Sequence, residues 1–185
     1  ITSDAVQRQD NSGSMRVRGA EVFLRRTLTS RFFGWLSYTY SRAEFRNDPA
    51  SPYRNSQFDQ THVVNLAGSY KLNTTWELGG RYNYHTGSPR TPIHAAVYNA
   101  SLDKYQPRQD SEDEYAARLP NFNSATLYCT SDILFDTWKM AVKFGIESYW
   151  PTAQVFGITY NYDFSKEKEQ TGLKAIPFLE VRGEL

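Results

Sequence analysis

Ionic and amide side chains recur at alternate positions in two stretches of the chain, Trp76–His85 and Trp138–Ser148, between apolar or aromatic residues. Strand residues that are two or four positions apart lie on the same face, so each stretch presents a row of polar groups. Such a row can bind a polar solute through ion pairs and hydrogen bonds, or it can simply solvate the surface that carries it. The six candidates for ligand binding are Glu77, Arg81, Asn83, Lys139, Lys143 and Glu147.

A group of carboxylates lies in a polar segment further along the chain. Ca²⁺ takes several carboxylate oxygens as ligands, and this segment holds Asp110, Glu112, Asp113 and Glu114. The run lacks the Asp-x-Asp-x-Asp-Gly spacing of a known calcium loop, so we do not predict a calcium site there.

Histidines, serines and the cysteine give no stronger signal for chemistry. His62 and His85 fall on opposite faces of their predicted strands, so zinc binding by these two and His94 is not expected. No serine lies in a Gly-x-Ser-x-Gly setting. Cys129 is interpreted as a small buried or lipid-facing residue rather than a reactive thiol. The sequence therefore predicts no catalytic residue, no metal and no cofactor, and we expect that the protein is not an enzyme.

The elements that must position these residues are strands. The signal is clearest from Thr61 to Gly87, where two alternating segments are joined by a polar turn at 71–75. In the second segment the even-numbered residues from Trp76 to Tyr84 are apolar, aromatic or glycine, whereas the odd-numbered residues include full charges. A strand that meets hydrocarbon on one face and water on the other has this composition, with aromatic residues near its ends.

The same alternation extends along most of the chain, and the connections alternate between short turns and long links. The predicted strands are Met15–Arg26, Arg31–Phe45, the two segments of Thr61–Gly87, Phe122–Leu134, Trp138–Ser148 and Ile176–Leu185; the long links are Arg46–Gln60, Ser88–Asn121 and Trp150–Lys174. Bacterial outer-membrane barrels have short periplasmic turns and long outside loops. We therefore predict that the three long links lie at one end of a sheet, as outside loops where a ligand is first captured.

Composition supports an all-β protein and limits the classes of function. Aromatic residues make up 15% of the 185 residues, and the formal net charge is only +1 without a long basic run, so nucleic-acid binding has little electrostatic support. No apolar run approaches the roughly 20 residues of a membrane-spanning helix. The strands of a transmembrane barrel need only about 10 alternating residues each.

The strand count predicts an open section rather than a complete barrel. The first and the seventh strand of an antiparallel series run in the same direction, so seven such strands cannot close on themselves, and open edges cannot face lipid. We predict an antiparallel transmembrane β-barrel segment over residues 15–185, with about 7–8 strands, preceded by a polar tail or half-loop at residues 1–14. We favour a terminal section of a larger barrel over the alternative in which residues 1–14 supply a missing strand.

Ten short segments carry a resemblance to a known family through their order and spacing, although none is specific alone. They are Arg18–Val22, Gly34–Ser41, Phe58–His62, Trp76–Arg81, Thr86–Pro89, Tyr105–Pro107, Arg118–Pro120, Phe135–Lys139, Gly172–Leu173 and Arg182–Glu184. Over nearly its whole length, the chain resembles the C-terminal barrel region of TonB-dependent outer-membrane receptors.

The resemblance implies a 22-stranded barrel in the outer membrane, plugged by an N-terminal domain, that imports iron chelates, cobalamin, sugars or similar solutes. The implied partners are outer-membrane lipid, the remaining strands and plug on the same or another chain, and a TonB-type energy-coupling partner that acts through the plug. The barrel-assembly machinery is a further implied partner, which in this family reads a terminal Phe where this chain has Leu185. On this interpretation the six candidate residues face the lumen, where they line a solute path or contact a plug.

Two alternatives remain open at this point. A small soluble or self-contained β-barrel binding protein would show the same alternation with the faces inverted, so that its Trp and Tyr residues fill a closed interior. A barrel enzyme with catalytic groups at its rim would leave no recognisable signature in the sequence.

Overall fold

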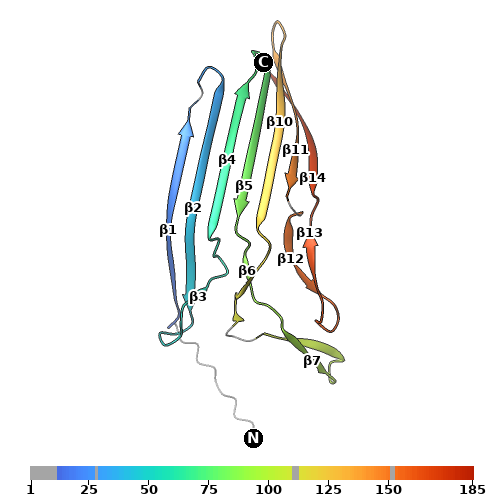
Figure 1. Cartoon of the computed structure of the whole chain (residues 1–185). Coiled ribbons are helices and arrows are strands. Elements are labelled where there is room, and N and C mark those ends of the chain that lie inside the picture. Colours follow the sequence, from blue (N-terminus) through green and yellow to red (C-terminus); the bar gives the residue numbers. More distant parts are fainter. Residues whose placement is uncertain (1–11, 28, 110–112, 151–152) are drawn as a thin grey trace.

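The structure is a computed structural model that describes residues 12–27, 29–109, 113–150 and 153–185 (Figure 1). Seven long strands form one antiparallel sheet in the order β1-β2-β4-β5-β10-β11-β14, with the short β3 paired to β2. The long strands are β1 (Ser14–Arg26), β2 (Phe32–Arg46), β4 (His62–Lys71), β5 (Trp76–His85), β10 (Phe122–Leu134), β11 (Lys139–Tyr149) and β14 (Ala175–Glu184). All seven predicted strands are confirmed; the bounds of β10 match the prediction, and the other bounds differ from it by no more than two residues.

The long links contain short strands that the sequence analysis did not predict. They are β3 (Arg54–Asn55), β6 (Pro89–Arg90), β7 (Ala95–Asn99), β8 (Lys104–Arg108), β9 (Ala117–Arg118), β12 (Val155–Tyr160) and β13 (Glu167–Thr171). They pair as β2–β3, β6–β9, β7–β8 and β12–β13. The two-residue strands β3, β6 and β9 are too short to show a readable alternation.

The strand register separates the two faces of the sheet as the alternation predicts. Residues directly opposite each other on neighbouring strands share a face. Leu36 lies opposite both Leu24 and Leu66, Leu66 lies opposite Tyr82, and on the next strands Leu127 lies opposite Ile146. We call this side of the sheet the apolar face and the other side the polar face.

The apolar face is not covered by any second layer among the described residues. Trp76, Leu78 and Phe144 are 40%, 46% and 51% exposed. Apart from Pro89 and two glycines, the buried apolar residues that the described ranges contain are Ala43 and Ala153. A closed interior filled by the Trp and Tyr residues, which the soluble-barrel alternative requires, is therefore not the arrangement of these residues.

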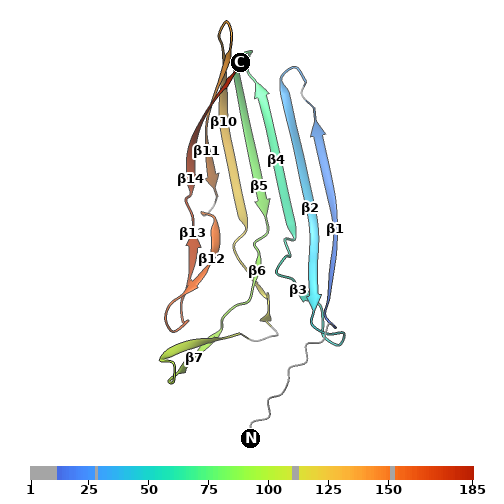
Figure 2. The same ribbon diagram turned by 180° about the vertical axis from the view of Figure 1, so that it is seen from behind.

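The two ends of the sheet differ as the link lengths predict. The short turns β1–β2, β4–β5 and β10–β11 lie at the upper end in Figure 1, and the short strands of the three long links lie at the lower end. The reverse view in Figure 2 shows the same arrangement. We call the second end the link end.

The sheet has two free edges among the described residues, β1 and β14, and both strands run in the same direction. Residues 1–11 lie outside the described residues, so the alternative that the first 14 residues supply another strand falls largely there; Ser14 itself begins β1. Among the described residues, no helix has the length and apolar character of a membrane-spanning helix.

Candidate functional site

The structure brings all six predicted ligand-binding candidates to the polar face. Across β5, β10 and β11, Arg81 lies opposite Thr126, which lies opposite Glu147. Asn83, two residues after Arg81 on β5, lies opposite Ser124. The remaining candidates are Glu77, Lys139 and Lys143, and they lie on the same face of β5 and β11 as Arg81 and Glu147. Their role in binding a ligand stays a prediction.

Several of these side chains already have partners on the polar face. Glu147 accepts hydrogen bonds from the hydroxyls of Ser124 at 3.0 Å and Tyr149 at 3.3 Å. The Lys143 ammonium lies 3.8 Å from a carboxylate oxygen of Glu180 and 4.3 Å from the centre of the Tyr128 ring. On the polar face, several ionic side chains thus already pair with charged or hydroxyl groups of neighbouring strands.

A polar recess of about 600 Å³ lies at the short-turn end of the polar face. Within it, the Lys139 ammonium pairs with Asp132 at 3.0 Å. Its charged lining residues are Arg31, Lys71, Glu77, Asp132, Lys139 and Arg182. Positive groups exceed negative ones there, so the recess suits an acidic or hydroxyl-rich group.

The histidines lie apart, each with its own partner. His62 lies on the apolar face, with Nδ1 2.9 Å from the Tyr38 hydroxyl, whereas His85 lies on the polar face, as the sequence predicts. In the second long link, His94 Nε2 lies 3.3 Å from Asp113. Across the part of the chain that the structure describes, no three His, Cys, Asp or Glu side chains gather as metal ligands would.

The run of carboxylates is only partly described. Asp110 and Glu112 lie outside the described residues. Asp113 faces His94, and Glu114 lies 3.6 Å from the guanidinium of Arg54. The two described carboxylates thus pair with basic side chains.

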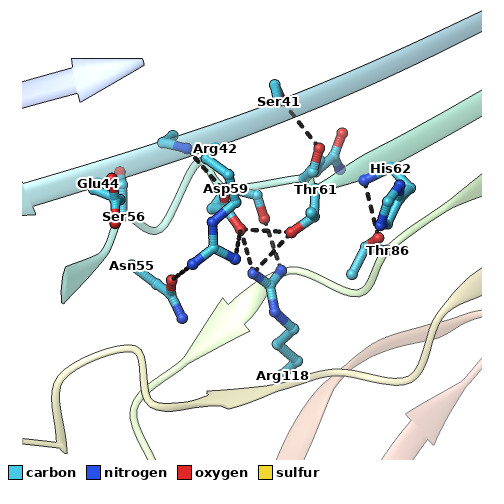
Figure 3. A network of polar contacts seen from close by, with 12 residues as sticks. Ser41, Arg42, Glu44, Asn55, Ser56, Asp59, Thr61, His62, Thr86 and Arg118 are labelled. Carbon is cyan, nitrogen blue, oxygen red and sulfur yellow. Dashed lines mark hydrogen bonds and ion pairs between the residues drawn. The ribbon is translucent and has the colours of Figure 1, made fainter. Parts of the chain in front are cut away.

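The most buried polar group of the described chain is a carboxylate at the link end, which the sequence analysis did not single out. Asp59, between β3 and β4, has no exposed surface. Its Oδ1 accepts a 2.7 Å hydrogen bond from the Ala43 amide of β2, and its Oδ2 accepts one of 2.9 Å from the Thr61 hydroxyl. Oδ2 also pairs closely with the guanidinium of Arg118, at the end of β9 (Figure 3).

Arg118 extends this contact to the backbone of two links. Its Nη1 donates to the carbonyl oxygens of Asp59 at 2.9 Å and Gly87 at 3.0 Å, and its Nη2 donates to the Thr61 hydroxyl at 3.2 Å. The guanidinium of Arg42 lies 3.8 Å from the same Asp59 carboxylate. We call the group formed by Asp59, Thr61, Gly87 and Arg118 the Asp59 clamp.

The electrostatics of the clamp favour a charged carboxylate. Burial alone raises the pKa of Asp59, but hydrogen bonds from the Ala43 amide, Arg118 and Thr61, together with the positive charge of Arg118, outweigh it. The pKa of Asp59 is therefore held below its ordinary value. Asp59 remains ionised at neutral pH and is suited to hold the links in place rather than to transfer protons.

Glycine is required at position 87, where the start and the end of the second link come together beside the clamp. A Cβ on Gly87 would lie 1.7 Å from the carbonyl oxygen of Leu119, a distance no side chain tolerates. The link is closed there by the Leu119 amide, which donates to the Ser88 oxygen at 3.0 Å.

Further contacts connect the three links to one another. The Tyr115 hydroxyl donates to Gln57 at 3.2 Å, which joins the second link to the first. Arg90 of β6 donates to the Tyr160 hydroxyl at 3.0 Å and to Glu167 at 3.0 and 3.2 Å, which joins the second link to the β12–β13 hairpin. The links thus form one connected rim over the link end of the sheet.

The clamp brings together three segments that are far apart in the sequence. Phe58–His62, Thr86–Pro89 and Arg118–Pro120 meet through Asp59, Gly87 and Arg118. The signal available in the sequence was one acid, Asp59, and one base, Arg118, beside turn-forming residues in two links that hold several other charges. That signal does not say which acid meets which base.

Comparison with known proteins gives no match: no family model, no curated protein and no solved structure matches the chain.

Proposed function

We propose that this chain is a section of the wall of an outer-membrane β-barrel of the TonB-dependent receptor type and that it serves solute uptake. Its polar face supplies lumen surface, and its linked rim supplies the outside loops that first meet a solute. The proposal rests on one observation: large apolar side chains are exposed across one face of a single-layered sheet, while ionic side chains gather on the other face of β5, β10 and β11.

Physical reasons support this use of the two faces. Soluble monomers rarely expose contiguous apolar surface over more than a few hundred Å². Here Leu24, Leu66 and Leu127, on β1, β4 and β10 of one face, are 58%, 46% and 66% exposed. Lipid covers such a surface, and water in a lumen solvates the ionic face.

The free edges support a wall that continues beyond this sheet. The outer backbone groups of β1 and β14 have no strand partner among the described residues. Unpaired backbone groups in hydrocarbon cost several kcal/mol each, so spanning sheets close completely. Since both edges run in the same direction, closure takes further strands, from the same polypeptide or from another. The 22-stranded barrel and its plug are the form of closure that the resemblance favours.

Two neighbouring residues on opposite faces test the proposal. Leu127 is 66% exposed on the apolar face, and Thr126, its neighbour on β10, occupies a position on the polar face. Leu127→Lys places an ammonium in hydrocarbon and costs about 2–4 kcal/mol of insertion free energy, whereas Thr126→Lys meets water and the carboxylate of Glu147 one strand away.

The assay is transfer of the full chain from water into micelles of an uncharged detergent whose alkyl chains are brominated, followed by quenching of tryptophan fluorescence. A bilayer would first require the two free edges, β1 and β14, to close. We expect strong quenching for the wild type and for Thr126→Lys, and weak quenching for Leu127→Lys. Equal quenching of the two variants, or a wild type that stays in water without quenching, contradicts the membrane assignment.

A further inference from the structure

Charged side chains on the apolar face gather at one corner of the sheet. The corner lies at the link end of β1 and β2 and consists of Arg16, Arg18, Arg42, Glu44 and Arg46. We call this group the basic corner. Along the described part of the seven long strands, the apolar face carries only one other charged residue, Arg26.

The register places the basic corner directly beyond the apolar part of the face. On β1 and β2 the opposed pairs run from Leu24 with Leu36 to Ala20 with Tyr40, and the next pair is Arg18 with Arg42. From Arg26 to Arg18 the strand rises about 26 Å, at about 3.3 Å per residue. With a strand tilt of about 40° that is roughly 20 Å of height, close to the apolar band of about 25 Å in transmembrane barrels.

Arginines dominate the charge of this corner, because one carboxylate serves two of them. Arg16 and Arg18 both donate to Oε2 of Glu44, at 2.9 and 3.2 Å. The side chains of Arg16 and Arg18 are nevertheless 41% and 68% exposed, while that of Glu44 is 16% exposed. A guanidinium carries five N–H donors, so one bond to Glu44 does not exhaust either arginine.

An aromatic ring from the first link holds two of the guanidinium groups at the surface. The Tyr53 ring centre lies 3.8 Å from Arg16 and 4.8 Å from Arg46. The Tyr53 hydroxyl lies 3.2 Å from the hydroxyl of Ser14, which in turn accepts a 2.8 Å bond from Arg46. The corner is thus ordered before any ligand binds, which lowers the entropic cost of binding.

We propose that the basic corner binds the phosphate headgroup of an anionic lipid in the membrane leaflet at the link end. Guanidinium groups bind phosphate oxygens in pairs of parallel hydrogen bonds. Lipid chains would lie along Leu24 and Leu36 of the adjoining apolar face while the headgroup meets the arginines. This inference rests on the proposed function, because it requires the apolar face to be the lipid face.

The test measures lipid binding to the full chain in micelles of an uncharged detergent. Cardiolipin, which carries two phosphates, is titrated, and bound lipid is counted by native mass spectrometry. We expect Arg16→Gln with Arg18→Gln to weaken cardiolipin binding roughly thirtyfold. Each arginine near an anionic lipid surface raises the affinity about fivefold, and two arginines are removed. Glu44→Gln removes the competing carboxylate and should strengthen binding.

The matched control removes the same charge from the β7–β8 hairpin of the second link, away from the apolar face. Lys104→Gln with Arg108→Gln should leave cardiolipin affinity unchanged. Equal loss in both double variants would overturn the inference, because binding would then follow total charge. Binding of inorganic phosphate as tight as that of cardiolipin would also overturn it, because the acyl chains would contribute nothing.

Failure of this inference is distinguishable from failure of the proposed function. If the wild type is quenched in brominated micelles but shows no preference for cardiolipin over phosphatidylcholine, the lipid site is refuted and the wall assignment stands. If the wild type is not quenched, the wall assignment fails, and the lipid site fails with it.

Discussion

Substitution of Asp59 by Ala should release the rim from the sheet. The change removes the acceptor of the Ala43 amide and leaves the guanidinium of Arg118 without its closest carboxylate. Asp59 has no exposed surface and the Arg118 side chain is 24% exposed, so water replaces the lost partner only in part. Breaking a buried pair by removing one partner costs about 3–5 kcal/mol. Local opening of the links should therefore rise by at least about a hundredfold.

Native-state hydrogen exchange in detergent micelles is the measurement. The reporters are the amides of Ser56, which donates to Ala43 O at 2.9 Å, and Leu119, which donates to Ser88 O at 3.0 Å. Neither amide touches the Asp59 side chain, so faster exchange reports opening of the links rather than loss of one bond. Asp59→Asn keeps the shape and loses the charge, and should cost about 1.5–3 kcal/mol.

The matched control is Arg108→Gln in β8 of the second link, the link that also contains Arg118, where the side chain of Arg108 is exposed. Surface substitutions of this kind usually change stability by less than about 0.5 kcal/mol. If Asp59→Ala and Arg108→Gln give the same exchange at Ser56 and Leu119, the clamp does not hold the links. A double-mutant cycle of Asp59→Asn and Arg118→Gln should show non-additivity, because the two side chains interact directly.

The same clamp predicts a pH dependence with a defined sign. The pKa of Asp59 is lower in the folded protein than its ordinary value of about 3.9. The stabilisation by Asp59 is therefore fully present above the ordinary pKa and is lost as the pH falls through the lowered folded value. Exchange at Leu119 should accelerate relative to its intrinsic rate below about pH 4, and the Asp59→Asn variant should lack this step.

Two further substitutions test the rim. Gly87→Ala should destabilise the closure of the second link by about 1–3 kcal/mol through the clash with the Leu119 oxygen, and limited proteolysis should cut the link faster; Gly157→Ala is the control, since its nearest neighbour is the end of the Gln170 side chain at 3.5 Å. Arg90→Gln should free the β12–β13 hairpin at a cost of about 1 kcal/mol, because Glu167 is half exposed and its ion pair is screened; unchanged hydrogen exchange in β12 and β13 would contradict this.

The alternation of residue types determined much of the fold without tertiary information. Since strand side chains alternate between faces, the even positions of Trp76–His85 and the ionic positions of Trp138–Ser148 specified which residues share a face. The register confirms that Glu77, Arg81 and Lys143 lie together on the polar face. The lengths of the links likewise predicted that one end of the sheet carries the large excursions.

Tertiary structure alone decided how the links fold and which charges meet. The partner of Asp59 is Arg118, 59 residues away, and the two meet only because β9 lies beside the connection between β3 and β4. Local sequence could not supply this pairing, because an ion pair depends on where the chain returns and not on the residues beside it. The basic corner needed both levels: parity put Arg16 and Arg18 on the apolar face, and strand pairing brought Arg42 and Arg46 beside them.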